Sequence, residues 1–181
     1  MPEPLTGNDI AKAPEGPGPA ELAGRGRIRP ILIHPDPVLR QICTPVGHLS
    51  WDRLCQLAGD LLATMYDAKG RGLAAPQIGE PFRMFVMDAH WKSGEPQPRI
   101  FLDPTLLAFS GSAVLEEGCL SIPDHPVTVA RPTEITFGHF DMMGNARSTT
   151  LSGIEARIAL HEADHLDGRL IIDYLPDAGR P

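Results

Sequence analysis

The pattern that most clearly indicates chemistry is H-E-x-x-H, at residues 161–165. His161 and His165 are four residues apart, so on a helix both imidazoles lie on one face and can bind the same metal ion. Glu162 lies beside that ion and can transfer a proton rather than serve as a ligand. Two histidines do not complete a tetrahedral site, so we expect a third protein ligand and a fourth position left for water.

The third ligand is a cysteine or a carboxylate, and the residues alone leave this choice open. Cys119 has the best context, because glycine and polar residues flank it in the run Glu116–Ser121. Cys43 and Cys55 have apolar neighbours, which is typical of cysteines that act as small buried hydrophobic residues. The carboxylate candidates are Asp164, Asp167 and Asp173.

A glycine-rich segment, Gly70–Gln77, forms another cluster. Gly72 allows a ligand or a backbone to approach closely, and the two alanines after Leu73 leave space that larger side chains would fill. Gln77 supplies a neutral amide donor and brings no competing charge to a metal. The segment has neither the G-x-G-x-x-G nor the G-K-[ST] pattern of phosphate-binding loops, so nucleotide binding is not indicated.

Helices and strands of an α+β fold are expected to position these clusters. Ser50 is placed to cap a helix that ends near Gly70, because leucines recur after it at helical spacing. A second helix carries the histidines; Ser152 and Glu155 form its S-x-x-E capping box, and it runs toward Gly168. Mixed or antiparallel short strands pack around this helix. They are expected at Arg83–Asp88, Arg99–Leu102, Ile135–Phe140 and Ala146–Leu151.

Length and composition narrow the functional classes. The 181 residues suit one domain with a substantial core, and the net charge of −7 disfavours nucleic-acid binding as the main function. Three cysteines cannot form a disulfide framework, and no segment has the pattern of a secretory signal or a membrane span, so we expect a cytoplasmic protein. Residues 1–27 are rich in proline and glycine, which predicts a flexible tail before a single catalytic domain at residues 28–181.

In order and separation, the three clusters together resemble the signature motifs of the peptide deformylase family. Those motifs have the form G-x-G-L-A-A-x-Q, E-G-C-L-S and H-E-x-D-H, and here they are Gly70–Gln77, Glu117–Ser121 and His161–His165. The segment Ile33–Arg40 is similar to the family's opening segment. The resemblance covers about residues 29–175 and implies the family's α+β fold. It also implies a metal-dependent hydrolase that removes the formyl group from the N-terminal methionine of new polypeptides and releases formate.

By this resemblance, the clusters contribute three kinds of residue to one active site. Glu162 takes a proton from the attacking water and passes it to the leaving amine. The Gln77 side-chain amide and the Leu120 backbone N–H stabilise the oxyanion. Ligand softness alone suggests Zn²⁺, whereas the resemblance implies Fe²⁺, which Zn²⁺, Ni²⁺ or Co²⁺ can replace. The implied metal ligands are Cys119, His161 and His165.

The resemblance also implies how a formyl-methionyl peptide binds. The peptide lies extended beside Gly70, Arg71 and Gly72, like an added strand. Ile154 and Ile158 are the candidates for the apolar methionine pocket, because they share the helical face of the histidines. The ribosome is a further expected partner, although the chain ends without the long C-terminal helix that some members use there. No membrane or direct nucleic-acid partner is expected.

Three residues depart from the family's usual pattern. Leu160 stands in place of a glutamine, Arg71 in place of an aliphatic residue, and Pro126 in place of an arginine that some members carry. Arg71 and the expected lack of the C-terminal helix motivate an alternative, a deformylase-like paralogue with altered substrates or low activity. A binding protein with a structural metal is disfavoured, because the motifs supply three ligands rather than four. A zinc peptidase is a weaker alternative, since an upstream cysteine ligand is unusual for those enzymes.

Overall fold

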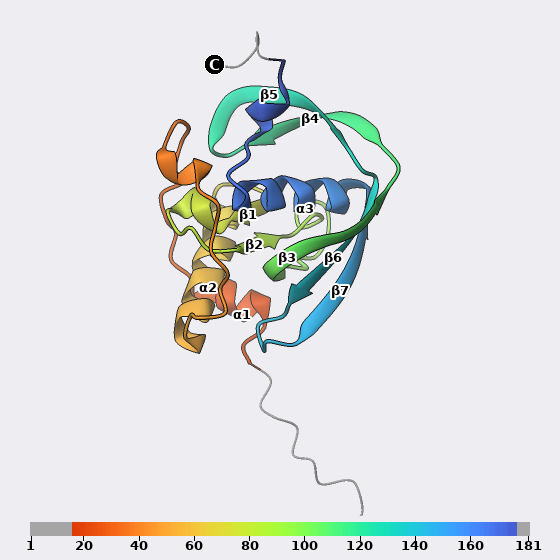
Figure 1. Ribbon diagram of the computed structural model, residues 1–181. Helices are drawn as coiled ribbons and strands as arrows, with labels where there is room; N and C mark the ends of the chain where they lie inside the picture. The colour runs from red at the N-terminus through yellow and green to blue at the C-terminus, as the bar shows by residue number, and fades with distance from the viewer. Residues whose placement is uncertain (1–15, 177–181) are drawn as a thin grey trace, which may run out of the picture.

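Two antiparallel sheets and three α-helices make up residues 16–176, the part of the chain that the computed structural model describes (Figure 1). The larger sheet has the strand order β1-β2-β3-β6-β7, and β4 and β5 form a separate hairpin, so the expected α+β class is confirmed. The strands are β1 Gly72–Ala74, β2 Met84–Met87, β3 Arg99–Ser110, β4 Ala113–Cys119, β5 Ile122–Arg131, β6 Glu134–Phe140 and β7 Ala146–Ser152. The helices are α1 Pro19–Arg25, α2 Trp51–Asp67 and α3 Gly153–Leu166, with 3₁₀ turns at Pro37–Arg40, Ala75–Ile78 and Ile171–Tyr174. No helix within residues 16–176 is long and apolar enough to cross a bilayer.

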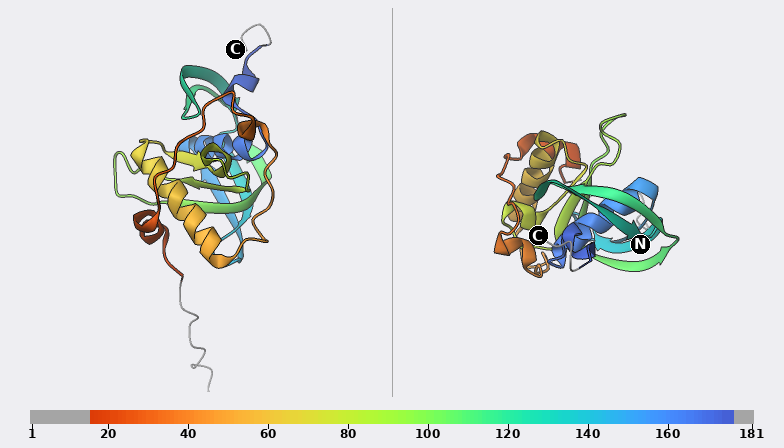
Figure 2. Two further views of the ribbon diagram at one scale, coloured as in Figure 1. Left: turned by 90° about the vertical axis from the view of Figure 1, so that its left-hand side faces the viewer. Right: turned by 90° about the horizontal axis from the view of Figure 1, so that it is seen from above.

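Strand β2 shows why a helix covers each face of the larger sheet. All four of its side chains are buried, and they alternate between two cores. Met84 and Val86 pack in the core that contains the leucines of α2. Phe85 and Met87 pack in the core that contains α3, where the rings of Phe85 and Phe101 stack with centroids 4.7 Å apart. Helices α2 and α3 therefore lie on opposite faces of the sheet (Figure 2).

Helix α3 lies between the larger sheet and the β4–β5 hairpin (Figure 1). The hairpin has a small core of its own, in which Val127 and Val129 pack with residues of the last 3₁₀ turn. Helix α3 ends at Leu166, and Gly168 follows with a φ of 70°. A Cβ on Gly168 would lie 2.5 Å from the carbonyl oxygen of Arg40, so glycine is required at this stop, and the expected helix end is confirmed.

The two predicted helix starts have different outcomes. Ser50 caps α2 as expected, because its Oγ accepts a hydrogen bond from the backbone N–H of Arg53 at 3.3 Å. The predicted capping box of α3 is wrong, since the Ser152 side chain makes no capping hydrogen bond. Glu155 instead forms an ion pair with Arg99 at 3.1 Å. Tertiary contact with β3 has replaced the local interaction that the sequence pattern suggested.

The β4–β5 hairpin and the short strand β1 were not expected from the sequence. In β4, Glu116 and Glu117 resemble loop residues, and in β5 so do Pro123 and Asp124. The hairpin pairs only with itself, so much of its length faces solvent and tolerates polar side chains. Its apolar alternation is therefore too weak to be recognised in the sequence. The four expected strands are present, and β3 continues to Ser110, well beyond its predicted end.

The flexible tail predicted for residues 1–27 does not extend to its predicted end, although residues 1–15 lie outside the described part of the chain. Helix α1 has seven residues, and its Leu22 is 2% exposed in the core beneath α2. Gly26 then crosses α2 so closely that a Cβ on it would lie 1.9 Å from the carbonyl oxygen of Gly59. The segment packs through one buried leucine and one glycine–glycine contact, so it has no apolar periodicity from which the sequence could predict its packing.

We expect Gly26→Ala to lower the free energy of unfolding by about 1–3 kcal/mol, because the added methyl group forces α1 and the backbone of α2 apart. Gly24→Ala is the matched control: a Cβ there meets no atom within 4 Å, and alanine favours the helix by roughly 0.5–1 kcal/mol. Urea unfolding of both variants measures the difference. Equal stability of the two variants would show that residues 16–27 do not pack as described.

Candidate active site

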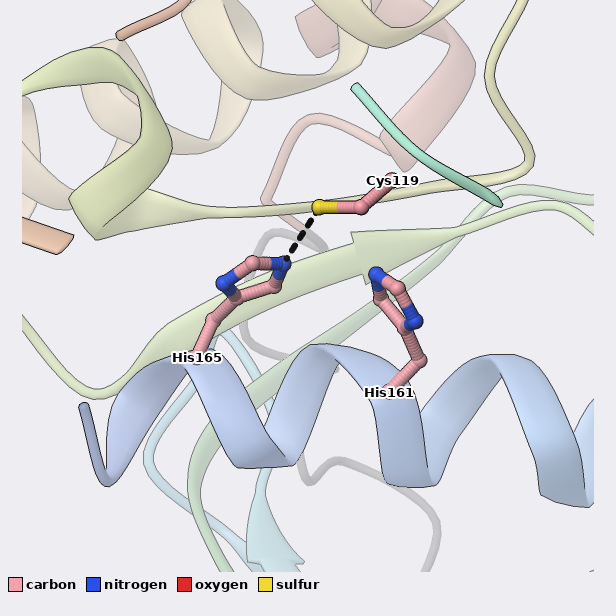
Figure 3. Close-up of side chains that lie close together, drawn as sticks. All are labelled: Cys119, His161 and His165. Atoms are coloured by element: carbon pink, nitrogen blue, oxygen red, sulfur yellow. Dashed lines mark hydrogen bonds between the residues drawn. The ribbon is translucent and has the colours of Figure 1, made fainter. Parts of the chain in front are cut away.

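Helix α3 and the end of β4 bring a cysteine and two histidines together. The ligand atoms of Cys119, His161 and His165 all lie within 4.8 Å of one another. Figure 3 shows both imidazoles rising from α3 toward Cys119, whose Sγ lies 3.4 Å from Nε2 of His165. All three residues are at most 9% exposed. One thiolate and two imidazoles at this spacing fit a divalent transition metal with one coordination position left open.

The aspartates that the sequence left as alternative ligands are engaged elsewhere. Asp164 accepts hydrogen bonds from Arg131 at 2.8 Å and from the Tyr174 hydroxyl at 2.7 Å. Asp167 and Asp173 form ion pairs with Arg83 and Arg40, respectively, at 2.6 Å each. Cys119 is thus the candidate that the tertiary structure places with the histidines.

Glu117 anchors one of these histidines. Its carboxylate accepts hydrogen bonds from Arg131 at 2.6 and 2.9 Å and from Arg157 at 2.6 Å. The remaining contact is with Nδ1 of His161 at 3.1 Å. Burial alone would raise the pKa of Glu117, but the hydrogen bonds from His161 and Arg131 lower it to about 2. An ionised carboxylate can only accept, so Nδ1 carries a proton and Nε2 of His161 is directed to the metal.

The two histidines have opposite electrostatic environments. Burial, and then the positive charges of His161 and Arg131, lower the pKa of His165 well below its usual value, so its ring is neutral. Burial also opposes a charge on His161, but hydrogen bonds with Cys119 and Glu117 and the charge of Glu162 raise its pKa to about 10. Metal binding at His161 therefore displaces a proton.

Glu162 is only 4% exposed, and its Oε2 has no hydrogen-bond partner among the described residues. Burial raises its pKa to about 7, although the charges of His161 and Arg131 act in the opposite direction. A Cβ on Gly72 would lie 2.4 Å from Oε1 of this carboxylate. The close approach expected at Gly72 is therefore made by Glu162 itself, and the carboxyl can accept or donate a proton near neutral pH.

Gln77 is held in a fixed orientation beside Cys119. Its Oε1 accepts a hydrogen bond from the backbone N–H of Ala74 at 2.9 Å, which turns the amide NH₂ toward Ser121 and Cys119. Nε2 donates to the hydroxyl of Ser121 at 3.1 Å and lies 3.9 Å from Sγ of Cys119. Leu120, which directly follows Cys119 in the sequence, is half-buried. Both donors expected for an oxyanion thus lie next to the metal-ligand cluster.

A cleft of about 440 Å³ opens over this cluster. Every residue predicted for the site lines the cleft except His165, which lies deeper and is 1% exposed. Ile154, at 41% exposure, and the half-buried Ile158 form part of its wall. The predicted lining residues that meet here are Gly70, Arg71, Gly72, Gln77, Cys119, Leu120, Ile154, Ile158, His161 and Glu162.

Sequence reasoning missed Arg131 and Arg157, which hold Glu117 in place. Arg157 also donates to the backbone carbonyls of Val129 at 3.1 Å and Ala113 at 2.7 Å, so it fastens the hairpin to α3. One signal was available: Arg157 precedes His161 by four residues and therefore shares its helical face. A lone arginine there indicates no partner until the hairpin is folded over the helix.

We expect Glu117→Gln to weaken metal binding by about 10–100-fold, because His161 loses the acceptor that orients its ring. Removal of the carboxylate also leaves two buried guanidinium groups with less compensation, which costs about 3–5 kcal/mol of stability. Competition with a metal chelator and urea unfolding measure the two effects. Glu116→Gln is the matched control, since this neighbouring side chain is exposed and has no ion pair among the described residues. Equal metal affinity of the two variants would contradict the role of Glu117.

Comparisons with known proteins agree with this geometry. The Polypeptide deformylase family profile matches residues 28–180. The peptide deformylase of Brucella suis biovar 1 (strain 1330) is 47% identical over 150 residues, which cover 82% of this chain and 85% of that protein. The crystal structure of a peptide deformylase from Legionella pneumophila has a TM-score of 0.77 and 37% identity and covers 85% of this chain and 89% of its own. A Met-Ala-Ser-bound structure of the Acinetobacter baumannii enzyme has a TM-score of 0.75 and 30% identity, with coverage of 82% and 99%. The chain belongs to the polypeptide deformylase family.

Proposed function

We propose that this protein hydrolyses the N-formyl group from the N-terminal methionine of newly made polypeptides. The observation that carries the proposal is the buried Glu162 carboxyl beside the Cys119, His161 and His165 cluster, at the floor of an open cleft. A proton-transfer group, a metal site and room for a peptide are the components that amide hydrolysis requires.

The substrate binds as an extended strand along the cleft. Strand β1 is an edge strand, because β2 pairs with only one of its sides, so the backbone of Gly70–Gly72 can pair with a peptide. Ile154 and Ile158 receive the methionine side chain on the face of α3 that also bears His161. The related Acinetobacter baumannii structure is Met-Ala-Ser-bound, which supports a peptide that begins with methionine as the substrate of this protein.

The reaction uses groups of this chain in sequence. Glu162 accepts a proton from the attacking water and then donates it to the nitrogen of the leaving amine. The backbone N–H of Leu120 and the amide NH₂ of Gln77 stabilise the negative charge that forms on the former carbonyl oxygen. When bound, a divalent metal supplies a Lewis acid that makes water nucleophilic near neutral pH. The products are formate and a free N-terminal amine.

The proposal extends to the metal and the cellular setting. We propose Fe²⁺ as the physiological metal, on the basis of family membership, although the soft donor set also suits Zn²⁺. The free thiols of Cys43, Cys55 and Cys119 support a reducing compartment such as the cytoplasm. Action on nascent chains at the ribosome follows from the proposed substrate.

A paralogue with another substrate remains the second candidate, because Arg71 lies at the cleft and Leu160 departs from the usual family pattern. Comparison of kcat/KM for formyl-Met-Ala-Ser with that for a formyl peptide without methionine separates the two candidates. We expect a strong preference for methionine. Comparable values would favour the paralogue.

We expect Glu162→Gln to reduce kcat by at least about 10²–10⁴-fold while metal content is retained, because the amide keeps the shape of the side chain but cannot accept the proton. Formate release and metal analysis of the same preparation measure both quantities. Glu155→Gln makes the same chemical change on the same helix, away from the cleft lining, and we expect its activity to match the wild type. Undiminished turnover by Glu162→Gln would exclude the proposed mechanism.

Anaerobically purified protein is expected to contain about one iron per chain and to lose deformylase activity in air, since ferrous iron held by a thiolate oxidises readily. Reconstitution with Ni²⁺ under air tests the explanation, because this ion resists oxidation and should preserve activity. Protein that is isolated anaerobically with zinc alone, and is fully active, would overturn the assignment of iron.

A further inference from the structure

Three cations surround the mouth of the active-site cleft: Lys69, Arg71 and Lys92. All three are exposed and line the cleft, and together they are called the cationic rim. Within residues 16–176 none of them has an ion pair or a side-chain hydrogen bond to another residue. Lys92 has a single directed contact, over the ring of Trp91 at 5.7 Å from its centroid.

The lack of ion pairs distinguishes the cationic rim from the rest of the described surface. Apart from Arg27, every described arginine outside the cleft has a carboxylate oxygen within 4.0 Å. Of the acidic residues that line the cleft, only Glu116 is placed to offset the charge of the rim. Glu117 is paired with Arg131 and Arg157, Glu162 lies deep and next to His161, and Glu116 alone is exposed. Among the described residues, unpaired positive charge is thus concentrated at this opening, in a chain whose net charge is −7.

The backbone that carries the rim is held in place. The indole Nε1 of Trp91 donates to the carbonyl of Gly70 at 2.7 Å. The ring of Tyr66 packs edge-on against the Trp91 ring, with centroids 5.2 Å apart. The Tyr66 hydroxyl donates to Asp88 at 2.7 Å, and the backbone N–H of Asp88 donates to the carbonyl of Arg71 at 2.8 Å. The cations therefore project from a fixed frame, so the entropy lost when they bind an anion is limited to their own side chains.

We propose that the cationic rim binds acidic side chains in the one or two residues that follow the formyl-methionine. This inference rests on the proposed function, because it requires an extended peptide whose first residue lies at Glu162. Successive residues of an extended peptide advance about 3.3 Å, so the second and third residues leave the cleft within about 7–10 Å of the reacting bond. They pass along the Gly70–Gly72 edge, which bears Arg71 and is preceded by Lys69.

The test compares peptides that differ only in charge. We would measure kcat/KM for formyl-Met-Asp-Ser and formyl-Met-Asn-Ser, and for the pair with aspartate or asparagine at the third position, all amidated at the C-terminus. An exposed charge pair contributes about twofold, so contact with one to three of these cations predicts a preference for aspartate of about two- to eightfold at low salt. In about 0.5 M NaCl the ratio should fall toward one, because salt screens exposed charges.

Variants of the rim identify the source of the preference. Lys69→Asn, Arg71→Gln and Lys92→Gln together should reduce the aspartate/asparagine ratio to about one; asparagine suits position 69 because φ is 55° there. For a matched single change, Arg71→Gln should lower the ratio about twofold. Arg27→Gln should leave the ratio unchanged, because Arg27 is exposed, lies outside the cleft lining and has no ion pair within residues 16–176.

The outcomes separate the inference from the function on which it rests. A ratio near one for the wild type, or a ratio that the rim variants do not alter, overturns the inference while hydrolysis of the asparagine peptides upholds the proposed function. Hydrolysis of none of the formyl-methionyl peptides contradicts both. The salt dependence of the wild type needs no variant, so a variant that fails to fold does not remove the test.

Discussion

The buried carboxylate of Glu117 is the interaction on which the active site depends. It lies on β4, two residues before Cys119, and accepts hydrogen bonds from Arg131 on β5 and from Arg157 and His161 on α3. One anion therefore joins the element that carries the thiolate to the element that carries the imidazoles. Burying these charges is costly unless every one is paired, and here the pairs also set the relative position of the metal ligands.

The rest of the fold supports the two elements that Glu117 joins, the β4–β5 hairpin and α3. The larger sheet is covered on one face by α2 and on the other by α3, so the histidine helix is packed against a core that includes Phe85 and Phe101. The hairpin has little core of its own and closes over α3 largely through polar contacts. The free energy of local unfolding is smallest for an element that makes few apolar contacts with its neighbours. We therefore expect the β4–β5 hairpin to separate from the site before α3 does.

Charge is distributed differently inside the cleft and at its mouth. Around the metal ligands, cations and carboxylates form hydrogen-bonded pairs, and the low exposure of Glu162 keeps its carboxyl able to change protonation state near neutral pH. At the mouth, Lys69, Arg71 and Lys92 are exposed and unpaired among the described residues. The interior is thus arranged for one reaction, and the opening is arranged to attract an anionic group in its substrate.

The sequence by itself determined which residues are the candidates for the chemistry. The spacing of His161 and His165 places both rings on one face of a helix whatever the surrounding fold, and Ser50 caps its helix through a contact three residues away. The ordered motifs also indicated the fold class and the family. The first two inferences depend on local geometry, which is fixed by spacing along the chain, whereas the family follows from the resemblance of the motifs.

Only the tertiary structure decided the partners of those residues. Cys119, which residue chemistry left as one candidate and the family resemblance implied, meets the histidines because β4 folds over α3. Glu117, Arg131 and Arg157 come together from three separate elements. Likewise, α1 packs through one leucine and a glycine contact, and Glu155 pairs with β3 rather than capping its own helix. Contacts between residues distant in sequence follow from how the elements pack, and no single segment of the chain carries that information.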